Sequence, residues 1–321
     1  MSDISSIFLD YDTVSADDLD PSPLQNVAPN LVLAQGTRQV DVSRSIEGRA
    51  IVLLNKLRMT REVIAETKSL RLIALAATGT NNVDLDAARE YGVAVCNIRD
   101  YCTPSVVQHV LAVILALTQR LADYSRDAVD GTWAHSPHFT VLAHPIRELR
   151  GRTLGVVGWG VLGQAVAQAC QSALGMRVIV AARPGTTPTT NRLPLDALLA
   201  EADVVTLHCP LTPETTGLID ARRLALMKPD ALLVNTARGA LVDVDALAAA
   251  LRAGQIGGAA IDVLPQEPPV DGSPLFAPGL TRLIVTPHVA WAARESRQRC
   301  LEEMAANVRD FLAGGRRGRV V

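Results

Sequence analysis

Short apolar runs alternate with longer, helix-like stretches along almost the whole chain. In the N-terminal part, 61–67 and 85–91 repeat apolar side chains at helical spacing, and Asp84 and Gly92 provide start and stop signals for the second helix. Runs rich in Val, Ile and Leu, with the length of buried strands, flank these helices: 50–54, 72–76 and 93–97. This alternation is typical of parallel βαβ units.

The alternation becomes very regular after Arg152 and predicts a nucleotide-binding domain. Six apolar runs are expected to be its strands, with helices between them: 153–158, 177–182, 203–207, 231–235, 258–263 and 282–285. Such an array is typical of a doubly wound parallel sheet. Before it, 104–121 predicts a long apolar helix that opens with Thr103-Pro104. Residues 124–150 are less periodic, and we expect a surface loop or an oligomer contact there.

The C-terminal piece, 289–321, carries one helical pattern at 296–313 and is too short to be a domain. We therefore expect it to fold back onto the N-terminal part. Two domains result, residues 1–100 with 289–321 and an inserted domain of residues 101–288.

Composition narrows the class of protein. A length of 321 residues and a hydrophobic share of 48% suit two well-filled cores. The net charge of −2 gives no reason to expect a nucleic acid or an anionic membrane as partner. Five cysteines without a C-x-x-C pair favour a reducing compartment, so we expect a cytoplasmic protein without disulfides. The opening residues do not have the pattern of a signal peptide, and the most apolar stretch, 106–117, is too short to span a bilayer.

The segment 153–163 has the glycine spacing of a dinucleotide-binding turn. Gly158, Gly160 and Gly163 follow a predicted strand and open a helix, which makes the G-x-G-x-x-G pattern specific. Gly158 permits the tight turn, Gly160 lets the backbone approach a pyrophosphate, and Gly163 lets helix and strand pack closely. The helix N-terminus then attracts the phosphates. We therefore expect a nicotinamide dinucleotide as cofactor.

The end of the next predicted strand departs from the usual NAD pattern. An NAD site usually has Asp or Glu there to accept a hydrogen bond from the ribose 2′-hydroxyl. No acidic residue occurs between Gly163 and Asp196, and Arg183 stands near the strand end instead. Its guanidinium can pair with a 2′-phosphate or stack on adenine. We expect NADPH to be accepted, alongside NADH, although a merely solvated Arg183 is the alternative.

Three chemically suitable side chains follow three predicted strands, at the edge where open α/β sheets bind ligands. Arg238 can bind a carboxylate and a carbonyl oxygen together. His288 can give a proton near neutral pH, and a carboxylate such as Glu267 beside it favours the protonated imidazole. These are the groups that reduction of a 2-keto acid needs besides the hydride. The sequence therefore predicts such a reductase.

The chain resembles the D-isomer-specific 2-hydroxyacid dehydrogenase family over essentially its whole length. The segments that carry the resemblance are 158–163, 208–219, 227–229, 235–242, 262–268 and Pro287-His288. Within the family it is most similar to bacterial glycerate dehydrogenases, also called hydroxypyruvate reductases. That closer similarity is carried by 76–84, 101–106 and 231–239.

The resemblance implies a Rossmann-type doubly wound NAD(P)-binding domain inserted into a flavodoxin-like α/β substrate-binding domain. It implies NAD(P)H-dependent reduction of hydroxypyruvate, and of glyoxylate, to D-glycerate and glycolate; the D-stereochemistry rests on the resemblance alone. It also implies a homodimer whose contacts include residues 104–150. Arg238, Glu267 and His288 match the family's catalytic positions.

Further positions follow from the same resemblance. Asp262 matches a residue that faces the nicotinamide carboxamide, and Ala77–Thr80 matches backbone that binds the substrate carboxylate. The expected substrate-binding residues are Ala77, Thr78, Gly79, Arg238 and His288. The expected cofactor-binding residues are Thr103, Gly158, Gly160, Val161, Leu162, Gly163, Arg183, His208, Cys209, Pro210, Thr215, Thr236, Ala237, Arg238, Asp262, His288 and Ala290.

Alternatives stay open. A formate or phosphite dehydrogenase of the same family is one, although formate dehydrogenases pair the active histidine with Gln, and Glu267 argues against that. A non-catalytic NAD(H)-sensing regulator could keep the same site. A metal at His135, His138 and His144 is not expected, because no Cys or paired carboxylate completes a ligand set. Lys56 follows a predicted strand and faces either substrate or solvent.

Overall fold

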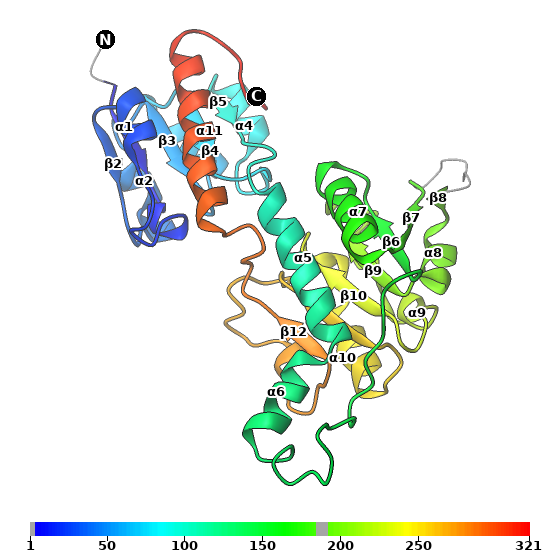
Figure 1. Cartoon of the computed structure of the whole chain (residues 1–321). Coiled ribbons are helices and arrows are strands. Elements are labelled where there is room, and N and C mark those ends of the chain that lie inside the picture. Colours follow the sequence, from blue (N-terminus) through cyan, green and yellow to red (C-terminus); the bar gives the residue numbers. More distant parts are fainter. Residues whose placement is uncertain (1–3, 184–191) are drawn as a thin grey trace. The chain divides into compact units, whose positions relative to one another are not determined.

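The computed structural model describes residues 4–183 and 192–321, which fold into two compact units (Figure 1). We call Met1–Cys102 together with Trp291–Val321 the terminal unit, and Thr103–Ala290 the central unit. Each unit has its own parallel β-sheet and its own hydrophobic core. The central unit is therefore inserted into a unit that both ends of the chain build.

The terminal unit has a five-stranded parallel sheet in the order β2-β1-β3-β4-β5. Its strands are β1 Ser6–Phe8, β2 Leu31–Leu33, β3 Ile51–Leu54, β4 Leu72–Leu75 and β5 Ala94–Cys96. The helices between and after them are α1 Ser22–Val27, α2 Val42–Ser45, α3 Arg61–Glu66, α4 Leu85–Glu90 and α11 Arg294–Leu312, with 3₁₀ turns η1 Tyr11–Thr13 and η2 Gln39–Asp41. This strand order is that of flavodoxin-like sheets, as predicted.

Both faces of this sheet are buried. Successive strand residues point to opposite faces, so each strand contributes side chains to both. Phe8 and Leu53 pack on one face with Met304 of α11. The helix α11 also contacts α1. Ile7 and Leu54 pack on the other face among the apolar residues of α3 and α4. The C-terminal helix thus completes the core of the terminal unit, which is why the last thirty or so residues fold with the first hundred.

The central unit has a seven-stranded parallel sheet in the order β12-β11-β10-β9-β6-β7-β8. Its strands are β6 Thr153–Val157, β7 Arg177–Ala181, β8 Arg192–Leu193, β9 Val204–Leu207, β10 Leu232–Asn235, β11 Gly258–Ile261 and β12 Leu283–Val285. Chain order reverses between β6 and β9, which pair in register from Leu154 with Val204 to Val157 with Leu207. A doubly wound sheet binds its ligand at such a reversal, beyond the carboxyl ends of the strands.

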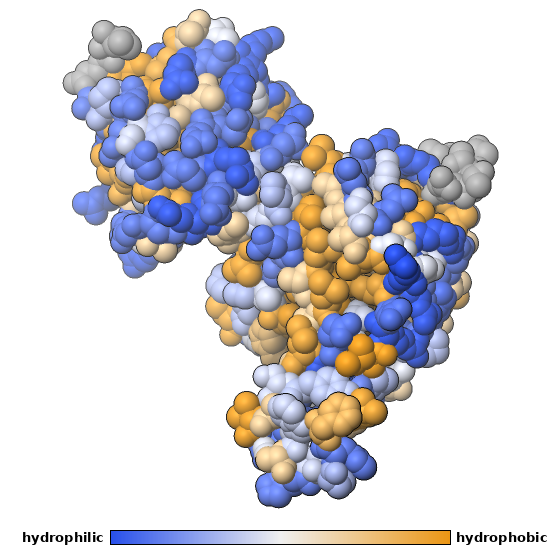
Figure 2. Space-filling view, viewed as in Figure 1, coloured by the Kyte–Doolittle hydropathy of each residue, from blue (hydrophilic) through white to orange (hydrophobic). Residues whose placement is uncertain are grey.

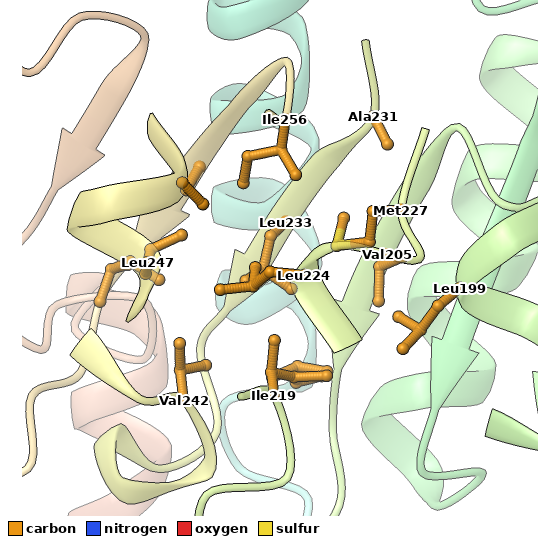
Figure 3. Close-up of a cluster of buried hydrophobic side chains, with 14 of the residues drawn as sticks. Leu199, Val205, Ile219, Leu224, Met227, Ala231, Leu233, Val242, Leu247 and Ile256 are labelled. Atoms are coloured by element: carbon orange, nitrogen blue, oxygen red, sulfur yellow. The ribbon is translucent and has the colours of Figure 1, made fainter. Parts of the chain in front are cut away.

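Helices cover both faces of this second sheet. They are α5 Thr103–Thr118, α6 Leu121–Val129, α7 Val161–Leu174, α8 Leu195–Glu201, α9 Ala221–Leu224 and α10 Val244–Arg252, with 3₁₀ turns η3 Gly239–Leu241 and η4 Pro274–Phe276. α5 packs against α7 and against β10, β11 and β12. α8, α9 and α10 contribute Leu199, Leu224 and Leu247 to a core that also contains Val205 and Leu233 of the strands (Figure 3).

The sequence did not predict every element. The apolar helix expected at 104–121 ends at Thr118, because Arg120 adopts the left-handed conformation with φ 55°, and a second helix, α6, follows. No residue of α6 is buried, and its apolar side chains face solvent. The strands β1, β2 and β8 and the helices α1 and α2 were also missed.

The end of α6 and the segment that follows it are largely exposed. Val129, Phe139 and Leu142 expose 86%, 91% and 85% of their surface, and Figure 2 shows apolar side chains at the end of the central unit where α6 lies. Among the described residues, no single helix is long and apolar enough to cross a membrane. Only α5 and α6 together reach that length and apolarity, and they are bent by 57°.

Candidate active site and cofactor site

The three predicted catalytic residues follow three neighbouring strands of the central sheet. Arg238 lies just after β10, Glu267 after β11 and His288 after β12. These strands pair in parallel, and their last residues, Asn235, Ile261 and Val285, are aligned. The loops that carry the three side chains therefore leave the sheet at the same edge.

His288 and Glu267 form a hydrogen-bonded pair. The Nδ1 atom of His288 lies 2.7 Å from Oε2 of Glu267, and the backbone N–H of Leu264 donates to the other carboxylate oxygen at 2.8 Å. Both side chains are partly exposed, 28% for His288 and 36% for Glu267. With Nδ1 turned to the carboxylate, Nε2 is the ring atom left to exchange a proton with a ligand.

The buried carboxylate of Asp262 holds the loop that carries His288. One of its oxygens accepts from the Thr286 hydroxyl at 2.5 Å and from Val289 N–H at 2.9 Å, and the other accepts from Ala290 N–H at 2.9 Å. The backbone N–H of His288 also donates to the Asp262 carbonyl at 2.8 Å. This network fixes His288 in the left-handed conformation, φ 55°, which a non-glycine residue rarely adopts. The contact of Asp262 with a nicotinamide stays a prediction.

The loop of Arg238 is held by its own neighbours. Asn235 donates from Nδ2 to the Arg238 carbonyl at 2.9 Å and accepts from Ala237 N–H at 3.0 Å. A Cβ atom at Gly239 would lie 1.9 Å from the carbonyl carbon of Leu264, so only glycine lets this loop touch the loop of Glu267. Sequence reasoning missed both supporting residues. The guanidinium is exposed and donates to the Ala237 carbonyl at 2.7 Å.

A cavity of about 930 Å³ lies at the reversal between β6 and β9, large enough for an organic cofactor. Seven predicted cofactor residues line it: Gly158, Gly160, Arg183, His208, Cys209, Pro210 and Thr215. Its wall also contains residues that were not predicted, among them Trp159, Arg192, Leu195, Asp196, Leu218 and Arg223. These come from the strand ends and from α8 and α9, and no sequence spacing brings them together.

The three glycines of the turn have different physical roles. Gly158 has φ 105°, and a Cβ there would lie 2.4 Å from the backbone nitrogen of Cys209. A Cβ at Gly163 would lie 2.1 Å from the Gly158 carbonyl oxygen, so the helix packs tightly on the turn. Gly160 borders the cavity at the start of α7 and has nothing within 4 Å of a built Cβ. This open approach to a helix N-terminus fits a pyrophosphate.

Two predicted cofactor residues carry buried hydroxyl groups without a partner. In the described part of the chain, Thr103 Oγ1 and Thr236 Oγ1 are buried and make no hydrogen bond. Buried polar atoms normally find a partner, so these two atoms fit a polar ligand group. The roles of Val161, Leu162, Ala237 and Ala290 stay predictions.

The charges on the cavity wall favour anions. The Asp196 carboxylate accepts hydrogen bonds from Arg222 at 2.7 Å and from Arg223 at 3.1 Å, and these guanidinium groups lower its pKa. Arg183 and Arg192 line the same cavity. The carboxylate that α8 supplies is therefore already neutralised by two arginines.

His208 lines the cavity as a neutral group. Burial lowers the pKa of its imidazole to about 4, and Nε2 lies 2.9 Å from the Thr206 hydroxyl. It therefore cannot act as a proton donor at neutral pH. This fits the expectation that His208 is a cofactor-binding residue.

The predicted carboxylate-binding backbone lies in the terminal unit, in the loop after β4. The carbonyl of Ala77 accepts from Ile98 N–H at 3.3 Å, and that of Thr78 accepts from Asn97 Nδ2 at 2.7 Å. Gly79 follows in the same loop, and the role of all three residues stays a prediction. Lys56 is exposed in the neighbouring loop, where the Asp10 carboxylate accepts from its backbone N–H at 2.7 Å.

The three clustered histidines have other partners. His144 Nε2 lies 3.0 Å from Asp127 Oδ2, and His135 Nδ1 lies 2.7 Å from the Gly131 carbonyl. His138 is exposed. Among the described residues, no group of three or more His, Cys, Asp or Glu side chains is placed to hold a metal ion.

Comparison with known proteins decides the family. Residues 111–290 match the model of the D-isomer specific 2-hydroxyacid dehydrogenase, NAD binding domain. The chain belongs to the D-isomer specific 2-hydroxyacid dehydrogenase family. It is 42% identical to the glycerate dehydrogenase of Methylorubrum extorquens over 85% of this chain and 86% of that enzyme. It is 34% identical to the hydroxypyruvate reductase of Blautia hydrogenotrophica, over 96% and 97% of the two chains.

Solved structures agree. A crystal structure from Thermus thermophilus matches with a TM-score of 0.87 and 36% identity, and covers 99% of this chain and 100% of that one. The predicted family and fold class are thus confirmed, as is NAD(P)H as cofactor. This member of the family is an NAD(P)-dependent oxidoreductase that acts on a CH–OH group.

Proposed function

We propose that this dehydrogenase reduces hydroxypyruvate to D-glycerate, and glyoxylate to glycolate. The observation that carries the proposal is the imidazole–carboxylate pair of His288 and Glu267, 2.7 Å apart on loops anchored to adjacent strands. The two relatives named glycerate dehydrogenase and hydroxypyruvate reductase support the choice of substrate. The same pair argues against a formate dehydrogenase, because the oxidation of formate does not need a protonated acid.

Each of the three side chains has its own role in the proposed reaction. The Arg238 guanidinium binds the carboxylate and the carbonyl oxygen of the keto acid. His288 donates a proton from Nε2 to that oxygen, while Glu267 accepts from Nδ1–H and stabilises the imidazolium. When bound, the reduced nicotinamide supplies the hydride for C2. Backbone N–H groups of Ala77, Thr78 and Gly79 are proposed to bind the substrate carboxylate as well.

Replacement of Glu267 tests this assignment. In Glu267→Gln the amide no longer favours the protonated imidazole, so kcat for hydroxypyruvate reduction at pH 7.5 should fall by about 10²-fold or more. Part of the loss should be recovered as the pH is lowered, which a kcat–pH profile would reveal. His288→Ala should cost several orders of magnitude in kcat at every pH.

Asp271→Asn is the matched control. It removes a carboxylate from the same loop, one that accepts from Gln266 Nε2 at 3.1 Å and does not contact His288. Its kcat should stay within about twofold of the parent. A loss of less than tenfold in His288→Ala would remove His288 from the acid role. A protein without turnover on hydroxypyruvate, glyoxylate or other small 2-keto acids would instead be a regulator that binds the cofactor.

NADPH is proposed to serve as cofactor alongside NADH. No carboxylate follows β7, Arg183 borders the cavity there, and Asp196 is engaged by two arginines. A 2′-phosphate at this end of the cavity would therefore meet guanidinium groups. In Arg183→Ala, kcat/KM with NADPH should fall by about tenfold or more while the value with NADH changes little. A preference of the parent enzyme for NADH above a hundredfold would contradict the proposal.

The protein is also proposed to be a cytoplasmic homodimer. All five cysteines are free thiols, which suits a reducing compartment. Large apolar side chains are exposed on α6 and on the segment after it, and exposed apolar side chains that gather in one region often mark a protein interface.

A further inference from the structure

A second cavity lies at the opposite edge of the central sheet, at the amino ends of the strands. It has a volume of about 70 Å³. Its wall combines residues at the starts of β6, β9, β10 and β12 with the end of α5 and with residues 145–149. The catalytic side chains and the cofactor cavity lie at the carboxyl edge, so this cavity is a separate place in the fold.

The guanidinium of Arg282 borders this cavity without an ion pair among the described residues. Its Nε atom is buried and has no hydrogen-bond partner there. Burial lowers the pKa of Arg282, the positive charges of Arg120 and Arg147 lower it further, and the Asp123 carboxylate raises it. A buried donor without an acceptor is costly, so the Nε–H group in this position calls for an acceptor such as an anion.

Two of the three carboxylates that line the cavity are already engaged. Asp230 is paired with Arg147. Asp203 accepts from Lys228 Nζ at 2.9 Å and from the backbone N–H of Thr153 at 2.7 Å, and it lies 3.6 Å from Arg152.

Two further carboxylates lie in this region. Asp123, the carboxylate near Arg120, is bound to it at 2.6 Å. Glu148 lines the cavity, but it is exposed and has no cation within 4.0 Å among the described residues. Arg282 is therefore the one arginine of the described cavity wall that has no ion-pair partner.

We propose that this cavity binds a tetrahedral oxyanion of the size of phosphate or sulfate, held by Arg282 together with Arg147. Guanidinium groups bind such oxygens through paired, charge-assisted hydrogen bonds. A volume of about 70 Å³ has room for a few heavy atoms, whereas organic ligands occupy pockets of roughly 300 Å³ or more. The ligand class is thus a small inorganic oxyanion, not a nucleotide.

The bound anion would tie together parts of the unit that are distant in sequence. Arg282 lies just before β12, Arg147 in the segment that returns from α6, and Thr118 at the end of α5. An anion that binds only the folded protein stabilises it in proportion to its occupancy. The site therefore acts on stability, and kcat at saturating substrate should not depend on it.

Thermal unfolding of the NADH-saturated protein tests the proposal, because the bound dinucleotide occupies the phosphate subsites of the other cavity. Inorganic phosphate is titrated to about 20 mM at constant ionic strength against chloride. A millimolar site should raise Tm by about 3 °C in a saturable manner. Isothermal titration calorimetry under the same conditions should give one phosphate bound per chain.

Three variants make the result specific. Arg282→Gln removes the charge and keeps a shorter polar side chain, so it should lose the saturable Tm rise and, without phosphate, unfold no lower than the parent. Arg252→Gln removes an exposed arginine of α10 and should respond as the parent does. Glu148→Gln should bind phosphate as well as the parent or better, because it removes a competing negative charge from the wall.

Other outcomes would overturn the proposal. An absent Tm rise in the parent, or an equal rise in Arg282→Gln, would show that the cavity does not hold phosphate. A rise that appears only in Glu148→Gln would show that Glu148 itself neutralises Arg282 in solution.

Discussion

Two histidines of the central unit show how surroundings decide the chemistry of one residue type. His288 is partly exposed, and its Nδ1 lies 2.7 Å from the Glu267 carboxylate. His208 lines the cofactor cavity beside the Thr206 hydroxyl, and desolvation lowers its pKa to about 4. The His208 ring is therefore neutral near pH 7, whereas His288 has the carboxylate partner that the proposed proton transfer uses. The sequence alone offered both residues at ends of predicted strands.

The buried imidazole of His208 should make the protein acid-sensitive. Its pKa is about 4 in the folded state and 6.5 in its ordinary state. Above pH 6.5 the ring is neutral in both states and has no effect on stability. As the pH falls from 6.5 toward 4, only the unfolded chain takes up the proton, so the free energy of unfolding decreases, by about 3 kcal/mol at pH 4. His208→Gln should remove this part of the pH dependence.

Urea unfolding of the parent and of His208→Gln at pH 7 and pH 4.5 would measure the effect. Between pH 7 and pH 4.5 the free energy of unfolding should decrease more in the parent than in His208→Gln. His138→Gln, which removes an exposed histidine, is the control and should follow the parent. If the variant and the parent lose the same stability between these pH values, His208 is not held neutral in the folded protein.

The elements that carry the catalytic residues are short loops tied to one another. Gly239 lets the loop after β10 touch the loop after β11, and Leu264 N–H of that second loop binds Glu267. Asp262, at the end of β11, holds the loop after β12 through three hydrogen bonds. The positions of Arg238, Glu267 and His288 thus depend on residues that never touch the substrate in the proposed mechanism.

The sequence predicted the strands that lie in longer apolar runs, and it missed β1, β2 and β8. All six strands expected in the central unit are present, while the two-residue β8 was not foreseen. The catalytic residues were predictable because parallel strands end at a common edge, so residues just after them must share it. The hydrogen bonds that the loop after β12 donates to Asp262 were not predictable. Most of their donors are backbone N–H groups, which are the same in every sequence. The cavity beside Arg282 likewise depends on packing between distant segments.

The glycines of the turn before α7 provide a matched pair of substitutions. A methyl group at Gly160 meets no protein atom within 4 Å but enters the cavity, so Gly160→Ala should fold normally and raise KM for NAD(P)H by about tenfold. A methyl group at Gly163 would lie 2.1 Å from a backbone oxygen that no side-chain rotation can move. Gly163→Ala should therefore destabilise the protein by about 1–3 kcal/mol.

Unfolding midpoints and initial rates at varied cofactor concentration separate the two effects. The expected pattern is a KM change without a Tm change in Gly160→Ala, and a Tm decrease in Gly163→Ala. Equal stability of the two variants would mean that the helix can shift to relieve the contact. An unchanged KM in Gly160→Ala would mean that the cofactor backbone does not pass this point.

At the scale of the whole molecule, the catalytic residues and the proposed anion site lie at opposite edges of the central sheet. Every strand of the central sheet runs parallel, so its carboxyl edge collects the catalytic loops and the cofactor cavity. Its amino edge collects Arg282 and the small cavity. In the segment of residues 121–146, large apolar side chains are exposed and belong to neither core.

The exposed apolar side chains of residues 121–146 predict that the protein forms a dimer. Phe139 and Leu142 expose 91% and 85% of their surface, and a second copy that covers them would remove apolar area from water. The parent should run at twice 34.2 kDa in size-exclusion chromatography with light scattering, and a Phe139→Ser/Leu142→Ser variant should run at 34.2 kDa. Val270→Ser, which alters a side chain 74% exposed outside this segment, should leave the mass unchanged. A monomeric parent, or a double variant that keeps the larger mass, would assign another role to the exposed segment.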